Sequence, residues 1–225
     1  MIKRITILIM IIITILILMK ISKVWANNNK NDDSEFIEKV NQEMIYIQNN
    51  FEENLYLLEN GNWQEIESNL DSLYIYWNTV ILDLNELEIK STNLSEFGKK
   101  LDELTLAVND KNKNVTKIRI CELYNYVYLY IQNYSTDEEF NNKFNIKRNL
   151  ILAYCIAENE NWELIYEYIK KAEESVKNIL NLNIIENRDN LNRLYISIKE
   201  LENSIELKDL GLFYKKHALV EKVYF

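Results

Sequence analysis

The sequence predicts an all-α protein, an antiparallel helical bundle or a set of stacked helical hairpins, with about seven helices after an N-terminal apolar helix. Proline is absent and only 3 of the 225 residues are glycine, which argues against a β fold with many tight turns. From residue 34 onward, apolar residues recur every three or four positions, the period of an amphipathic helix. Hydrophobic residues make up 48% of the chain, enough for a substantial core.

The first 26 residues predict export. Lys3 and Arg4 precede the apolar run Ile5–Met19, whose 15 residues span only about 22 Å as a helix, against ~30 Å for a hydrocarbon core. This length favours a signal peptide that is cleaved after Ala26. In the alternative, the run is retained as a signal anchor in the membrane. Either way, Lys3 and Arg4 hold the N-terminus inside, so the body is expected outside the cytoplasm, secreted or anchored to the membrane.

Polar breaks between the apolar stripes place the helices. The expected helices run over about 34–59, 62–89, 94–109, 115–134, 137–157, 161–181 and 184–208, with a last short helix in the tail 212–225. The polar stretch 109–114 is the predicted boundary between two halves. The predicted organisation is 1–26 as signal peptide or signal anchor, 27–33 as polar linker, 34–110 as a helical hairpin module, and 115–225 as a second helical module packed on the first.

The segment 115–134 has two competing periods. Tyr124, Tyr126, Tyr128 and Tyr130 alternate with other residues, as in a strand. Helical spacing is also present, and we favour a helix because no partner strand is evident in the rest of the sequence. The four tyrosines have two interpretations: an aromatic surface for a sugar or peptide, or packing in the core and rim of the bundle.

The two cysteines lie at equal distances from a predicted turn. The midpoint of Cys121 and Cys155 is residue 138, inside the polar stretch between two expected helices. An antiparallel hairpin would place the two side chains at the same level, where they can form a disulfide in an oxidising compartment. The alternative is two small buried apolar residues.

The two halves contain a similar motif. Glu59–Trp63 and Glu158–Trp162 share the pattern Glu-Asn-x-Asn-Trp at an offset of 99 residues, and each precedes a long amphipathic helix. Coincidence in a biased composition is one explanation. The other is a three- or four-helix module used twice, with the tryptophan at the start of the second helix closing the turn end of the core.

Residues 1–110 resemble small membrane-anchored or secreted all-helical families of unknown function from low-GC Gram-positive bacteria. The resemblance rests on the apolar run Ile5–Met19, on Asn62-Trp63 at the start of the second helix, and on Trp77 within it. The resemblance implies an exported helical protein and does not imply any activity. Those families are usually shorter, so the second half is a departure from them.

Charge and motifs exclude several function classes. The net charge is −9, and without the 4 basic residues of 1–26 the body has 22 basic against 35 acidic residues, or −13. Such a chain is repelled by phosphate backbones, so we expect no nucleic-acid partner. No phosphate loop, metal motif or nucleophile motif is present, and we expect no cofactor, no metal ion and no catalytic residues. His217, the single histidine, is expected on the surface or partly packed.

The sequence therefore favours a non-enzymatic, extracytoplasmic module that binds a protein or an envelope component. Residues 5–19 add a membrane contact if they are not cleaved. One alternative is a helical bundle that senses a small ligand. Another is an enzyme that acts on wall glycan through paired carboxylates, although no pair of acids stands out in the sequence.

Overall fold

The structure, a computed structural model, describes residues 36–86, 91–134, 137–182 and 188–224. The signal segment 1–26, the candidate cleavage site after Ala26 and the linker 27–33 lie outside these residues. In the described part of the chain, no helix is both long and apolar enough to cross a membrane. The chain divides into two compact units, residues 1–42 and 43–225, and the second unit contains most of the helices.

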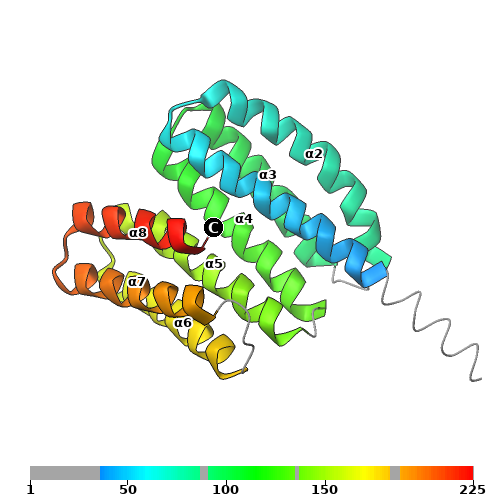
Figure 1. The fold of residues 1–225 in the computed structure, drawn as a ribbon. Helices are drawn as coiled ribbons and strands as arrows, with labels where there is room; N and C mark the ends of the chain where they lie inside the picture. Colours follow the sequence, from blue (N-terminus) through cyan, green and yellow to red (C-terminus); the bar gives the residue numbers. More distant parts are fainter. Residues whose placement is uncertain (1–35, 87–90, 135–136, 183–187, 225) are drawn as a thin grey trace, which may run out of the picture. The chain divides into compact units, whose positions relative to one another are not determined.

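The described residues are helical and contain no strand, which confirms the all-α prediction (Figure 1). The segment with two competing periods, 115–134, is a helix. A first helix spans 36–59, of which 43–59 belongs to the second unit. The others are α2 (Trp63–Glu86), α3 (Ser91–Asn109), α4 (Lys113–Tyr134), α5 (Glu138–Ile156) with a 3-10 turn at Ala157–Asn159, α6 (Trp162–Asn181), α7 (Arg188–Glu206) and α8 (Leu210–Tyr224).

Four tight turns join these helices in pairs. Each contains a residue with a left-handed backbone, and the φ values lie between 51° and 68°. In the turn between α3 and α4, the N–H of Lys111 donates to the carbonyl of Val108 and that of Asn112 to the carbonyl of Ala107, the two bonds of a Schellman motif. Asn112 then caps α4 by accepting from the N–H of Val115 at 3.2 Å. The four left-handed residues are Gly61, Lys111, Glu160 and Lys208.

The helical hairpin is thus the repeating unit. The left-handed residues follow one another at intervals of 50, 49 and 48 residues, and each is followed by Asn or Asp. The offset of 99 residues found in the sequence spans two of these intervals, so it matched every second turn. The turns at Lys111 and Lys208 lack the Glu-Asn-x-Asn-Trp motif, because no tryptophan follows them.

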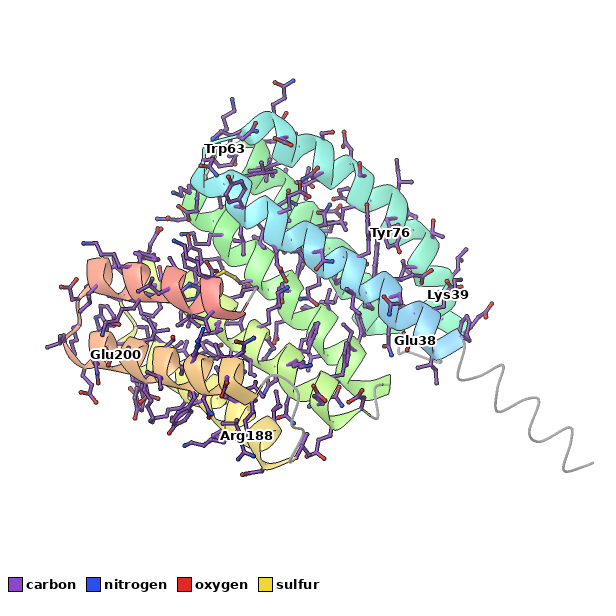
Figure 2. The ribbon with its side chains drawn as sticks, in the orientation of Figure 1. Glu38, Lys39, Trp63, Tyr76, Arg188 and Glu200 are labelled. Atoms are coloured by element: carbon purple, nitrogen blue, oxygen red, sulfur yellow. A yellow bond between two sulfur atoms is a disulfide. The ribbon has the colours of Figure 1, made fainter. Side chains whose placement is uncertain are left out.

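The hairpins assemble into two four-helix bundles. In the first bundle, the Phe97 ring of α3 lies 4.0 Å from the Trp77 ring of α2 and 6.4 Å from the Phe51 ring of helix 43–59, between ring centroids. Gln48 donates to the hydroxyl of Tyr124 at 2.7 Å, which brings helix 43–59 against α4. The second bundle has one apolar core built from α5, α6, α7 and α8. Figure 2 shows side chains between the helices of each bundle, with Trp63 at the first turn.

The polar stretch 109–114, predicted as a boundary, lies between two helices of the first bundle, and the division into 34–110 and 115–225 stays a prediction. This polar stretch is the tight turn between α3 and α4, which pack on each other within the first bundle. The first bundle ends with α4, and the second begins with α5. An exposed tight turn needs the same Asn, Asp and Lys residues as a linker, so composition alone does not separate the two.

Candidate functional site

A cleft of about 740 Å³ lies where the two bundles meet, lined by helix 43–59 and α4 of the first bundle and by α5, its 3-10 turn and α8 of the second. Its lining is amphipathic. The apolar part includes Leu55, Ile151 and Ala218. The polar part holds four carboxylates, two lysines, three tyrosines and a histidine, namely Glu52, Glu59, Glu158, Glu221, Lys117, Lys222, Tyr56, Tyr154, Tyr214 and His217.

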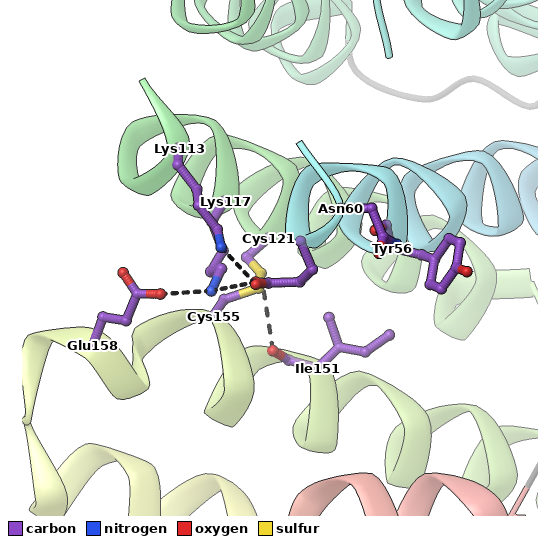
Figure 3. A network of polar contacts seen from close by, with 9 residues as sticks. Tyr56, Asn60, Lys113, Lys117, Cys121, Ile151, Cys155 and Glu158 are labelled. Atoms are coloured by element: carbon purple, nitrogen blue, oxygen red, sulfur yellow. Dashed lines mark hydrogen bonds and ion pairs between the residues drawn. A yellow bond between two sulfur atoms is a disulfide. The ribbon is translucent and has the colours of Figure 1, made fainter. Parts of the chain in front are cut away.

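Lys117 organises one end of the cleft (Figure 3). This lysine of α4 is only 1% exposed, and its Nζ lies 2.8 Å from Glu59 Oε1 and 2.8 Å from Glu158 Oε1. The Nζ also lies 4.7 Å from the ring centroid of Tyr154, within cation–π distance. A buried ammonium is tolerated only with such compensation. Lys117 therefore ties helix 43–59 to the 3-10 turn that follows α5.

Glu59 is held in its ionised form. Burial alone would raise the pKa of its carboxyl, but hydrogen bonds from Lys113, Lys117 and Tyr154 outweigh burial and lower the pKa to about 2. Lys113 forms a further ion pair with Glu59, with 2.6 Å between Lys113 Nζ and Glu59 Oε2. The group Glu59, Glu158, Lys113 and Lys117 thus balances its own charge.

A disulfide joins the bundles next to this ion-pair group. Cys121 on α4 and Cys155 on α5 are bonded, with their Cα atoms 6.4 Å apart, and both are buried (Figure 3). The separation lies within the usual range for disulfides. Cys121 is one helical turn from Lys117, and Cys155 is one turn from Glu158. The covalent link and the ion pair therefore fix the same junction.

His217 is buried, and the expectation of a surface or partly packed histidine is wrong. Its side chain on α8 is 1% exposed. Nε2 lies 2.9 Å from the carbonyl oxygen of Leu150, and since a carbonyl only accepts, Nε2 carries the proton. Nδ1 faces Glu221 Oε1 at 3.6 Å. Burial lowers the pKa of His217 to about 4, so the ring is neutral at pH 7.

The predicted aromatic surface of Tyr124, Tyr126, Tyr128 and Tyr130 is wrong. Tyr124 is fully buried, Tyr130 is 4% and Tyr128 is 9% exposed, and Tyr126 is half-buried. Residues two apart on a helix point about 200° apart, so the four tyrosines cannot all line one groove. They pack as the alternative interpretation expected: the Tyr128 ring lies 5.7 Å from that of Phe144 on α5.

A second charged cluster has a structural role. The Glu173 side chain on α6 is 1% exposed, and its carboxylate lies 2.9 Å from Lys170, 2.6 Å from Lys177 and 2.8 Å from Lys199. Lys199 belongs to α7, so the cluster ties α6 to α7. Three lysines surround this carboxylate, and it does not line the cleft.

The residues of the cleft were not indicated by the sequence. They come from four helices, and each has a common type at a spacing that suits an exposed helix face. One signal was present. His217 lies nine residues after its left-handed turn residue, where the other three hairpins place Leu70, Ile120 and Ile169. Recognition of the hairpin repeat would have assigned His217 to the core.

In the described ranges, no group of three or more His, Cys, Asp or Glu side chains is arranged to hold a metal ion. Comparison with family models, curated proteins and solved structures finds no match to this chain. The fold and the site define an all-α protein of two four-helix bundles with an amphipathic, carboxylate-rich cleft at the junction of the bundles.

Proposed function

We propose that this protein is an exported, non-enzymatic binding protein that takes up an envelope component or small molecule in the cleft between its bundles. The cleft carries the proposal. Its volume of about 740 Å³ falls within the range of small-molecule sites, roughly 300–1,000 Å³. Its combination of apolar walls and a few converging polar groups is also typical of such sites.

The ion pairs of the cleft favour binding over catalysis. Glu59 and Glu158 are paired with Lys117, and Glu52 is paired with Lys147 at 2.6 Å. The lowered pKa of Glu59 keeps this carboxyl ionised and makes it a poor proton donor. An enzyme acting on glycan needs one carboxyl that is protonated at the start of the reaction. The pairing of three of the four acids supports a site that recognises charge.

Two features support a location outside the cytoplasm. The first is the apolar run Ile5–Met19 with its preceding cations. The second is the Cys121–Cys155 disulfide, a bond that persists in oxidising compartments and is rare in the cytosol. If the N-terminal run is retained in the membrane, the polar linker 27–33 keeps the bundles near the membrane surface, a position suited to a sensor.

A thermal-shift screen of the full-length protein against a library of metabolites and envelope fragments tests this proposal. We expect at least one compound to raise the melting temperature, because a ligand that binds only the folded state adds RT ln(1 + [L]/Kd) to its stability. The shift should vanish in Ala218→Trp, where an indole at an exposed lining position fills the cleft.

Leu219→Trp is the matched control, since Leu219 is the neighbouring residue on α8, is 57% exposed and does not line the cleft. It should respond as the wild type does. If every compound that stabilises the wild type also stabilises Ala218→Trp, the cleft is not the binding site. If no compound acts and a protein is recovered from intact envelope by both tryptophan variants, a protein-binding surface outside the cleft replaces this proposal.

A further inference from the structure

One wall of the cleft has polar atoms without hydrogen-bond partners among the described residues. His217 Nε2 donates to Leu150, so the neutral ring presents Nδ1 as an acceptor. The group facing Nδ1 is Glu221 Oε1 at 3.6 Å, beyond hydrogen-bond distance and itself an acceptor when ionised. The hydroxyl oxygen of Tyr214 is also buried, and among the described residues nothing forms a hydrogen bond with it. A buried polar atom without a partner is costly unless a bound molecule satisfies it.

The side chains of His217, Glu221 and Tyr214 share one part of the cleft. The ring of Tyr154 lies beside two of them, 5.4 Å from the Tyr214 ring and 5.1 Å from the His217 ring, between centroids. Glu221 is one helical turn after His217 on α8, on the same face. All four residues line the cleft. A single small group in the cleft can therefore contact both a carboxylate and an imidazole nitrogen.

Among the described residues, Glu221 is the acid of the cleft that forms no ion pair with a lysine. Four glutamates and two lysines line the cleft, and Lys117 is already committed to Glu59 and Glu158. Lys222 follows Glu221 directly on α8 and so points about 100° away around the helix. The pKa of Glu221 is raised by burial and next by the charge of Glu52. Glu52 already has Lys147 beside it, so a cation that enters the cleft has Glu221 as its carboxylate partner.

We propose that the cleft binds a small organic ammonium ion with an apolar or aromatic body. The inference rests on the binding function proposed above and names its ligand class. The ammonium N–H groups donate to Glu221 and to His217 Nδ1, and the hydroxyl oxygen of Tyr214 is a further acceptor. The body of the ligand packs on Leu55, Ile151 and Ala218, the apolar side of the same cleft.

Isothermal titration of the full-length protein with three matched probes tests this. The probes are 2-phenylethylamine, 2-phenylethanol and 3-phenylpropionate, which share a ring and differ in charge. At pH 7.5 we expect the amine to bind on the order of tenfold more tightly than the alcohol, since charge-assisted hydrogen bonds are about twice as strong as neutral ones. The anion should bind most weakly, because it meets like charge.

Glu221→Gln should remove this preference by bringing the affinity for the amine down to that for the alcohol, with the alcohol unchanged. Glu174→Gln, at an exposed position of α6 outside the cleft, is the control and should keep the preference. Equal binding of amine and alcohol by the wild type, or an unchanged preference in Glu221→Gln, overturns the ammonium proposal. If a library compound still stabilises the wild type and not Ala218→Trp, the binding function stands with a different ligand class.

Discussion

Reduction of the Cys121–Cys155 disulfide should lower the free energy of unfolding by roughly 3–4 kcal/mol in the chain-entropy model of cross-links. The bond closes a loop with a sequence separation of 34, and the reduced chain regains that freedom mainly in its unfolded state. Urea unfolding of the full-length protein with and without reductant measures the difference as a shift of the midpoint. The loss should be accompanied by two titratable thiols per chain after reduction and by none before it.

Cys121→Ala together with Cys155→Ala supplies the control, because its midpoint should not respond to reductant. The state of the bond in cells is read by blocking thiols before lysis and comparing mobility on reducing and non-reducing gels. Two blocked thiols and one mobility in protein from the cell envelope would contradict both the disulfide in the native protein and its support for export.

Acid should destabilise the protein through His217. The folded-state pKa of this histidine is lowered to about 4 by burial, against about 6.5 in the unfolded chain. Between these values the unfolded state binds the extra proton, so stability is complete above pH 6.5 and falls as the pH decreases towards 4. The expected loss between pH 7 and pH 4.5 is roughly 2–3 kcal/mol, measured by urea unfolding at a series of pH values.

Two carboxyl groups that line the same cleft as His217, those of Glu59 and Glu221, titrate in neighbouring pH ranges. Glu59, with its pKa lowered to about 2, costs stability only below its unfolded value of 4.5. Glu221, with its pKa raised, acts in the opposite direction and stabilises the fold as the pH falls. The window from pH 6.5 to 4.5 therefore reports mainly on His217, with Glu221 reducing the slope.

His217→Leu isolates this effect. The equivalent positions of the other hairpins hold Leu70, Ile120 and Ile169, each buried, so leucine suits the site. The variant should lose most of the slope between pH 6.5 and 4.5 while it keeps the steep loss below pH 4.5. A variant as sensitive as the wild type between pH 6.5 and 4.5 would mean that His217 is protonated in the fold or is exposed.

The helices were predictable because their period is local. In α2, apolar residues at helical spacing such as Ile66, Leu70 and Leu73 form the buried face of the helix. The turns were found by their polar residues. The type of each turn is harder to predict. A left-handed lysine followed by a capping asparagine, as at Lys111 and Asn112, has the same composition as a linker.

The cleft was not predictable because it depends on how the bundles meet. Lys117 lies beside apolar residues of α4, and only the packing of helix 43–59 and α5 around it brings Glu59 and Glu158 to its ammonium group. The alternation of tyrosines in 124–130 suggests an aromatic binding surface, yet the Tyr124 side chain is fully buried. The cleft is lined by Tyr56, Tyr154 and Tyr214, which come from three different helices and form no local pattern in the sequence.

The cleft should hold a ligand in the protein's own environment. The most direct test is mass spectrometry of small molecules released from the full-length protein after native isolation from its own cells. We expect the wild type and Leu219→Trp to release the same compound in near-equal molar amount to protein, and Ala218→Trp to release none. Equal release from all three proteins, or no released compound from any of them, would contradict a ligand site in the cleft.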